Sequence, residues 1–477
     1  MNRACFPLST NLHKHNQHAS SIRPLKNKYI RMKKFLILIS ACLISSQGLI
    51  FSQQKVWSLE ECIIYAIENN IQIKQQVVQT EVQQNSLDLA KLKLLPTLNA
   101  QMSHDYSFGR ALDFTTYEYV DNNALNEYFS AGGGMTLFNG LVNYNTIQKS
   151  KAELLAGRED LQNIKDNISL NIALAYLQIL LNKELVSATN NQLQITLQQI
   201  EKTRRLVEAG STARGTLLQI EAQAAQEELQ LINMQNQLDI SFLNITQLLE
   251  LKTPEGFEII TPEIKIDTNS VIEGRIEEIY LLAVKNRPEI RSAELKLSAT
   301  EFDLKIAKGN RIPKISMNHS ISTRYSEIFN RPNIDPFSTQ IKNFKTIGLG
   351  FTLNVPILNG WQVNKSIDNS KLNIESTQYA LEGAKKTLYK NIQQAYADAV
   401  AALKKFNSSI KAVTSTEESL RYTEQKFNVG MVTPIDYNAA KTQLLNAQSD
   451  MSQAKYEFIF KTKVLDFYKG LPLKLNQ

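Results

Sequence analysis

The chain has 477 residues, of which 43% are hydrophobic and 21% are charged. These fractions are close to those of folded domains, so the composition excludes a disordered chain and a polytopic helical membrane protein. Glycine and proline are scarce, at 18 and 12 residues. Because both residues interrupt helices, their scarcity favours long uninterrupted helices over a loop-rich all-β fold.

The formal net charge of +7 comes from the first part of the chain. Residues 1–52 carry eight basic residues and no Asp or Glu, so the remainder is close to neutral. A protein that binds nucleic acid needs a basic surface on its folded part. We therefore expect no nucleic-acid partner.

The basic prefix has the plan of a secretory signal peptide. Lys33 and Lys34 follow Met32 and precede an apolar stretch over residues 35–50. This stretch is too short, and too interrupted by Ser and Gly, for a membrane-spanning helix. We therefore expect residues 1–52 to be a signal region, with Met32 as a candidate start.

Two processing routes fit the end of this region. Cleavage after Ser52 follows a small residue, whereas Ile39-Ser40-Ala41-Cys42 resembles a lipoprotein cleavage box, which would place a lipid on Cys42. Cys5 and Cys42 both fall in the prefix, so only Cys62 remains in an exported protein. We expect no intrachain disulfide and expect Cys62 to be a small buried residue.

The sequence shows no catalytic or metal-binding pattern. Three of the five histidines lie in the prefix, and His104 and His319 stand apart from any cluster of Cys, His or Asp. GxGxxG, P-loop, GxSxG and HExxH motifs are absent from the sequence. We therefore expect no enzyme activity, no cofactor and no metal site.

The rest of the chain contains a tandem repeat. Residues 58–73 align with residues 275–290, and further matches continue at a nearly constant spacing along both halves. Repetition on this scale indicates a duplicated structural unit. We expect a first repeat over 53–270 and a second over 271–477. The matched residues include Glu60 with Glu277, Asn69 with Asn286, Pro96 with Pro313, Asn139-Gly140 with Asn359-Gly360, Gly210 with Gly430 and Gln223 with Gln443.

Each half has two stretches in which apolar and polar residues alternate, as they do in a two-faced strand. The strands are expected at about 97–109 and 126–138 in the first half, and at about 314–325 and 345–357 in the second. Their apolar faces carry Leu98, Ala100, Met102, Tyr106, Phe108, Phe129, Ala131, Gly133, Met135, Leu137, Ile315, Met317, Ile321, Ile347, Leu349, Phe351, Leu353 and Val355.

The opposite face of these strands is rich in Ser, Asn, Gln, Thr and Gly. A pair of hairpins on a soluble core explains the alternation equally well, but a polar face with few charges suits a water-filled lumen. About ten residues are enough for a tilted strand to cross a bilayer. Four strands cannot close a barrel, and open edges in lipid leave backbone groups unpaired. We therefore expect the chain to form an oligomer.

A long helix without proline follows each pair of strands. At 1.5 Å per residue each would span on the order of 100 Å, and three-four spacing of apolar residues indicates packing between neighbouring helices. Gly210 and Gly430 end these helices, and a returning antiparallel helix follows each glycine. The long helices are expected over 140–208 and 360–428, and the returning helices over 212–250 and 434–470.

These features resemble the TolC-like outer-membrane efflux protein family. The likeness rests on the junctions LFNG at residues 137–140 and ILNG at 357–360, and on KFNVGMVTPIDYNAAKTQL at 426–444. It covers nearly all of residues 53–477. It implies a mixed α/β membrane protein that is mainly α, with long antiparallel coiled-coil helices and four transmembrane β-strands per chain. As a trimer, the strands would close one twelve-stranded β-barrel above a periplasmic α-barrel.

The resemblance also implies a function. The chain would be the channel-tunnel subunit of a tripartite efflux or type I secretion system in the outer membrane of a Gram-negative bacterium, with a large periplasmic portion. A homotrimer in outer-membrane lipid would passively conduct substrates from an inner-membrane pump and a periplasmic adaptor. The alternative is a trimeric stalk or adhesin-like coiled-coil protein without transport, which would usually place its β anchor once, at one end.

Two turns are the implied docking sites for the adaptor. Gly210 and Ser211 form the first turn, and Gly430, Met431 and Thr433 belong to the second. Both would lie at the periplasmic tips of the long helices. A plain helix cap without a partner explains the two glycines as well.

Asp436 is the implied pore constriction. It matches an acidic position that rings the periplasmic entrance in the resembled family. Ala439 and Thr216 occupy the positions at which further acidic residues would lie, so a trimer would offer one ring of three carboxylates. The alternative role is local, because an Asp at a helix start also stabilises the helix N-terminus.

Overall fold

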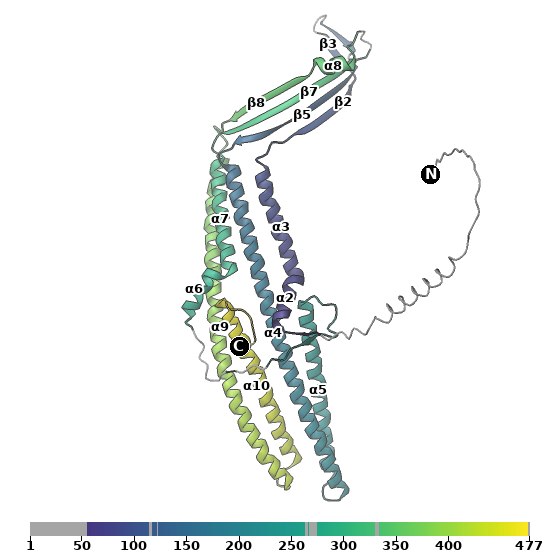
Figure 1. Ribbon diagram of the computed structural model, residues 1–477, viewed down its shortest axis with the longest axis vertical. Helices are drawn as coiled ribbons and strands as arrows, with labels where there is room; N and C mark the ends of the chain where they lie inside the picture. The colour runs from purple at the N-terminus through teal and green to yellow at the C-terminus, as the bar shows by residue number, and fades with distance from the viewer. Residues whose placement is uncertain are drawn as a thin grey trace, which may run out of the picture. The chain divides into compact units, whose positions relative to one another are not determined.

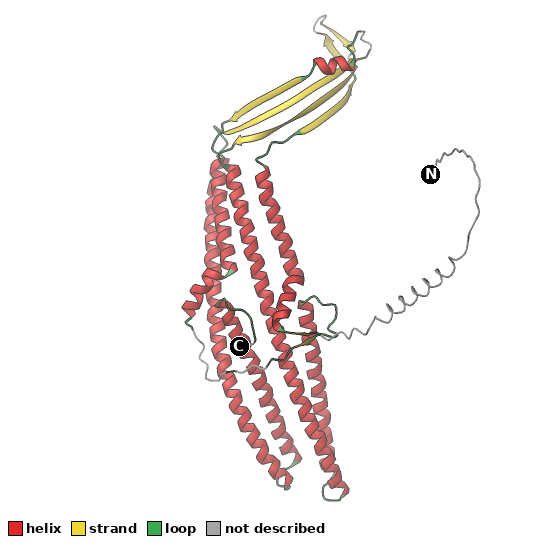
Figure 2. Ribbon diagram, viewed as in Figure 1, coloured by secondary structure: helices red, strands yellow, loops and turns green. Residues whose placement is uncertain are grey.

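The structure is a computed structural model that describes residues 55–113, 117–121, 123–262, 266, 274–329 and 333–475. The expected signal region, with Met32 and Cys42, lies outside these residues, as does the expected repeat boundary at 270 and 271. The chain divides into two units, Met1–Lys55 and Val56–Gln477. The second unit consists of long helices and a four-stranded sheet (Figure 2).

Each half of this unit starts with a short helix and a longer one. Ser58 and Glu61 form a reciprocal cap at the first of them, in which each side chain accepts a hydrogen bond from the other's backbone N–H. In the second half Pro288 is the first helical residue, a position where the missing N–H costs nothing. The helices are α2 (Leu59–Asn69), α3 (Ile71–Leu92), α6 (Ile276–Asn286) and α7 (Pro288–Gly309).

Two helices of 67 residues dominate the structure, and each is followed by a returning helix of 35 residues. The matching lengths agree with a duplicated chain. Each long helix begins directly after a left-handed residue, Leu141 with φ of 64° or Trp361 with φ of 61°. The helices are α4 (Val142–Glu208), α5 (Arg214–Leu248), α9 (Gln362–Asn428) and α10 (Pro434–Tyr468). None of the described helices combines the length and the apolarity needed to cross a membrane.

The main sheet has four antiparallel strands in the order β2-β5-β7-β8. They are β2 (Asn99–Ser107), β5 (Ala124–Phe138), β7 (Lys314–Ile328) and β8 (Thr346–Asn354). The expected bounds differ most in the second half. β7 continues beyond residue 325 because β5 pairs with it as far as Ile328. β8 ends before residue 357 because Pro356 has no N–H for the ladder.

Some described elements are absent from the sequence prediction. A small hairpin extends beyond the main sheet, and a short helix precedes β8 (Figure 1). A parallel pair of two-residue strands lies beside the middle of the helices. These elements are β3 (Arg110–Asp113) with β4 (Glu118–Asp121), α8 (Phe337–Asn343), and β1 (Val56–Trp57) with β6 (Glu258–Ile259).

The largest hydrophobic cluster joins α4 to α2, α5 and this strand pair. Tyr176 lies in it with 1% of its surface exposed. Its hydroxyl donates to the backbone oxygen of Ile260 at 2.6 Å, and burial raises its pKa. Cys62 is in the same cluster and fully buried, as expected. Tyr456 and Ile459 of α10 also belong to the cluster, so this core joins both halves of the chain around the middle of α4.

A second, polar cluster connects α10 to α4 and α5. The Lys441 ammonium donates to Thr196 Oγ1 at 2.7 Å, and this hydroxyl donates to Glu227 Oε2 at 2.5 Å. Gln192 and Gln223 donate to the other oxygen of Glu227. Burial lowers the pKa of Lys441 even though Glu227 acts to raise it. Lys441 of the second half is thus connected to Glu227 of the first half through the Thr196 hydroxyl, between packed helices.

We predict that Lys441→Met destabilises the protein, because it leaves the Glu227 carboxylate buried without its cation. Breaking a buried pair on one side typically costs about 3–5 kcal/mol of unfolding free energy. The double variant Lys441→Met, Glu227→Leu should recover most of this loss. The measurement is chemical denaturation of the purified protein.

Lys405→Met is the matched control. Lys405 pairs with Glu457 at 2.8 Å across α9 and α10, but its side chain is 52% exposed. Such surface pairs contribute about 0–1 kcal/mol. Equal losses for Lys405→Met and Lys441→Met would contradict the role of the buried cluster.

Candidate functional site

Apolar side chains of the sheet are aligned in rows from strand to strand, and His319 is the polar residue in the row between the two described next. Ala100 pairs with Ala131, Ala131 with Ile321, and Ile321 with Ile347. A second row contains Met135, Met317 and Phe351. Because side chains alternate between the faces of a strand, residues paired across strands lie on one face. Most of the apolar residues predicted from each strand separately therefore join into one surface. Leu98, Phe108 and Val355 lie outside the strands, and a bulge shifts the register of β5 at Leu137.

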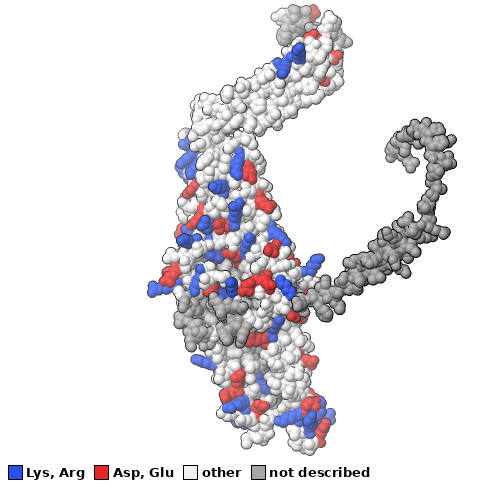
Figure 3. Space-filling model, in the orientation of Figure 1, with Lys and Arg blue, Asp and Glu red and all other residues white. Residues whose placement is uncertain are grey.

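The opposite face is polar along the same register. Gln101, Ser130, Ser322 and Thr346 form one row. Other rows hold Asn99, Gly132, Ser320 and Gly348, and Thr136, Ser316 and Thr352. Small uncharged polar groups of this kind line aqueous channels. In Figure 3 the middle of the visible part of the sheet is free of charged side chains, and several lie near the end away from the helices.

The apolar face has little cover in the single chain. Ile347, Leu349, Phe351 and Leu353 on β8 are each more than 60% exposed. β2 and β8 lie at the two edges, and each pairs with a strand on one side only. A large apolar patch and two open edges mark surfaces that other molecules cover.

The two turns between long and returning helices have the same geometry and lie at the end of the unit away from the sheet (Figure 1). At the first, Ser211 N donates to Leu206 O and Gly210 N to Val207 O, both at 2.9 Å. This is the bonding pattern of a Schellman cap. Gly210 has a φ of 72° and no atom within 4 Å of an added Cβ, so conformation and not space requires glycine.

The second turn repeats this cap. Met431 N donates to Lys426 O at 2.9 Å and Gly430 N to Phe427 O at 3.0 Å, with a φ of 75° at Gly430. Met431 is 76% exposed. The turns are therefore well-formed caps that present exposed side chains, a geometry compatible with docking and also with a cap that has no partner.

Asp436 takes part in a reciprocal cap with Thr433 at the start of α10. Thr433 N and Oγ1 donate to Asp436 Oδ2 at 3.1 and 2.7 Å, and Asp436 N donates to Thr433 Oγ1 at 3.2 Å. The hydrogen bonds from Thr433 lower the pKa of Asp436. Its carboxylate is exposed and ionised at neutral pH. The local role anticipated for Asp436 is thus present in the chain.

The predicted site residues fall into two places. Gly210 and Ser211 belong to one turn, while Gly430, Met431, Thr433 and Asp436 belong to the other and to the helix that follows it. Sequence reasoning missed the polar cluster around Lys441, which lies on the same helix as Asp436. Nothing in the sequence around Lys441, five residues after Asp436, indicates that its side chain is buried.

Comparison with known proteins identifies relatives of the whole folded unit. The outer membrane efflux protein family matches residues 63–250 and 279–460. TolC, an outer membrane protein of Escherichia coli K12, is 21% identical over 396 residues, which are 82% of this chain and 78% of that protein. PrtF of Dickeya chrysanthemi, a proteases secretion protein, is 20% identical over 440 residues and 90% of each chain.

A solved structure has the same fold. The outer membrane protein VceC from Vibrio cholerae matches with a TM-score of 0.72 at 16% identity, over 88% of this chain and 97% of that one. The duplicated plan of long antiparallel helices and four strands, predicted from the sequence, is therefore confirmed.

The two segments that match the family lie in the two halves of the chain, and each contains two strands of the main sheet and a long helix. Proteins of this family are outer-membrane channels with a large periplasmic portion, which confirms the predicted location and channel role. The chain belongs to the outer membrane efflux protein family.

Proposed function

We propose that three copies of the chain form one channel through the outer membrane. Each copy would supply two repeats, 53–270 and 271–477, and four strands to a twelve-stranded barrel. The observation that carries this proposal is the sheet, whose apolar and polar rows stay in register up to two open edges. Pairing β8 of one copy with β2 of the next would satisfy both edges and enclose the polar face.

The helices would continue this channel into the periplasm. A periplasmic adaptor would dock at the turns of Gly210–Ser211 and Gly430–Met431, and an inner-membrane pump would supply the substrate. The names of TolC and PrtF, an outer membrane protein and a proteases secretion protein, support a place in an export system. The stalk or adhesin alternative gains no support from the family match, which names efflux.

Asp436 would have two roles in such a trimer. Its bonds to Thr433 hold the start of α10, and three copies of its carboxylate would ring the periplasmic entrance. Rings of carboxylates attract cations. Hydrogen bonds lower the pKa of Asp436, so its carboxylate stays charged at pH values that would protonate an ordinary Asp. The cap bonds to the carboxylate are lost only when the pH falls below this lowered pKa.

The barrel predicts different tolerance on the two faces of β8. Leu349→Arg or Phe351→Arg places a charge on the lipid face, at a cost of about 2–4 kcal/mol near the midplane. We expect both variants to lose the trimer that shows heat-modifiable migration in the outer-membrane fraction. Thr352→Arg on the polar face is the matched control and should assemble. Equal assembly of all three variants would refute the lipid-facing assignment.

The adaptor predicts specific crosslinks at the turns. A photo-reactive residue at Ser211 or Met431 should capture a periplasmic adaptor in cells, identified by mass spectrometry of the crosslinked band. Tyr379, which is 64% exposed on α9 and distant from both turns in sequence, is the control position. Capture of other copies of this chain alone would favour turns that are simple caps.

The channel itself is tested by conductance in planar bilayers. The wild-type trimer should conduct with a preference for cations and should be blocked by trivalent cations from the periplasmic side. Asp436→Asn keeps an oxygen acceptor for Thr433 but removes the charge, so cation preference and block should fall while trimer melting stays nearly unchanged.

Asp450→Asn on the same helix is the matched control and should behave as wild type. Earlier melting of the Asp436→Asn trimer with unchanged selectivity would show that Asp436 is only a cap. An assembled wild-type trimer without conductance would favour the stalk alternative.

A further inference from the structure

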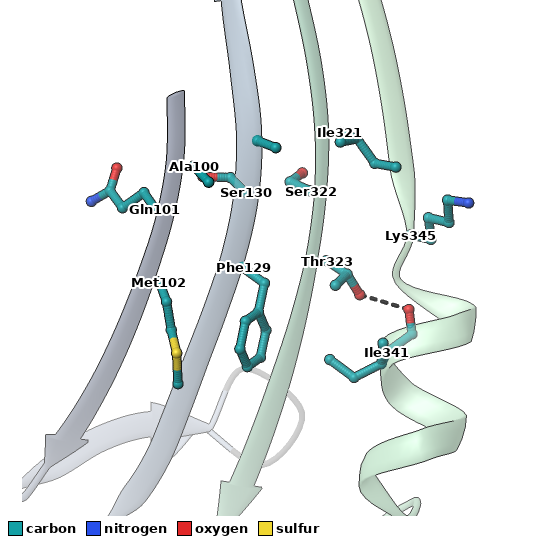
Figure 4. Close-up of a pocket in the computed structure, with 11 residues that line it drawn as sticks. Ala100, Gln101, Met102, Phe129, Ser130, Ile321, Ser322, Thr323, Ile341 and Lys345 are labelled. Atoms are coloured by element: carbon teal, nitrogen blue, oxygen red, sulfur yellow. Dashed lines mark hydrogen bonds between the residues drawn. The ribbon is translucent and has the colours of Figure 1, made fainter. Parts of the chain in front are cut away.

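An apolar slot lies between the sheet and α8 on the apolar face (Figure 4). Its volume is about 550 Å³, within the range of ordinary ligand pockets. Ala100 and Ala131 form part of its floor, and larger apolar side chains border them. In Figure 4 the side chain of Ile341 on α8 points toward Phe129 across the slot. The bordering residues include Met102, Phe129, Ile321 and Ile341.

The slot exists because α8 replaces a strand at this part of the sheet. β8 begins at Thr346, which pairs with Ser322, so the rest of β7 has no strand on that side. The Gln340 amide pairs with both the N–H and the C=O of Ser326, each at 3.0 Å. Thr323 Oγ1 also donates to Ile341 O at 2.7 Å. These bonds attach α8 to β7 at one side of the slot.

One positive charge lies at the slot, and none of the described residues that line it is acidic. Lys345 is the charged residue among the described lining residues, and none of the described carboxylates forms an ion pair with it. The carboxylates farther along this face have other partners. Glu127 bonds to His104 at 2.7 Å, and Glu327 accepts from Tyr325 at 2.8 Å.

Lys345 stands at the end of the apolar band. Along β7 this face carries Met317, His319, Ile321 and Thr323, and then the polar-tipped Tyr325 and the charged Glu327. Lys345 directly precedes Thr346, which pairs with Ser322, so its backbone lies at this boundary. In Figure 4 its side chain extends from the edge of the slot, away from Phe129. The boundary belongs to the end of the sheet away from the long helices (Figure 1).

We propose that the slot binds lipid A, with one acyl chain on the alanine floor and a phosphate on the Lys345 ammonium. This inference rests on the proposed function, which places the apolar face in the outer membrane and the α8 end in the outer leaflet. Lipid A is the phosphorylated lipid of that leaflet. An apolar slot beside an unneutralised cation at the headgroup boundary matches an anionic lipid, because lysine binds phosphate and apolar lining binds the chain.

The test measures lipids that remain on the trimer after purification in detergent. Lipid A and phosphatidylethanolamine are quantified by mass spectrometry, and lipid A is then titrated back onto delipidated trimer. Lys345→Gln removes the cation and should weaken lipid A binding about tenfold, equivalent to about 1.4 kcal/mol. Ala131→Phe fills the floor and should release the lipid. Both variants should keep wild-type conductance.

Two substitutions outside the slot are the controls. Lys314→Gln removes a lysine at the other end of β7, and Leu353→Phe enlarges a side chain of the apolar face near that end. Both should retain lipid A as the wild type does. Should Ala131→Phe fail to assemble, Lys345→Gln still decides, because Lys345 lies between α8 and β8 and not in the sheet.

The outcomes separate the slot from the channel. A conducting trimer whose lipid A content is unaffected by Lys345→Gln would overturn the lipid site and leave the channel intact. Retention of phosphatidylethanolamine at the same level as lipid A would also overturn it. A wild-type chain that forms no heat-modifiable trimer would overturn the proposed function and the site together.

Discussion

A strand in a bilayer must pair its backbone N–H and C=O groups with other strands, because lipid offers no substitute partner. In this chain β5 and β7 have neighbours on both sides, whereas β2 and β8 each have one. The apolar and polar rows are in register from one edge to the other. Any strand that joined either edge would therefore extend both faces at once, and the open edges make the single chain a fragment of a larger sheet.

The long helices connect the sheet to the two turns at the other end of the unit. α4 and α9 have equal lengths and begin just after β5 and β8, so their two turns lie at the same distant end (Figure 1). Between the sheet and these turns, the core around Tyr176 and the buried Lys441 hold the helices of both halves together. A change in packing at Tyr176 or Lys441 would alter the positions of the turns through the helices that contact one another, and not through the sheet.

Periodicity and helix-breaking residues were sufficient to predict the long helices and the two-faced strands. Gly210 and Gly430 predict helix ends, because helices commonly end at a residue with left-handed backbone geometry and glycine adopts it most easily. The spacing of Thr433 and Asp436 already contains the cap that the structure shows. Two features could not be predicted from the sequence. The helix α8 is too short to show a hydrophobic period, and the burial of Lys441 depends on the packing of three helices. The direction in which Asp436 faces a pore depends on other copies of the chain.

The pairing of Gln340 with Ser326 has a consequence for the chain before it reaches the membrane. The Gln340 side-chain amide binds the backbone N–H and C=O of Ser326, which another strand would otherwise bind. It therefore takes the place of a backbone peptide group of a neighbouring strand. Newly exported chains carry exposed strand edges through an aqueous compartment, where such edges aggregate. One glutamine thus shortens the edge that can mispair, and it fixes where correct pairing along β7 must stop.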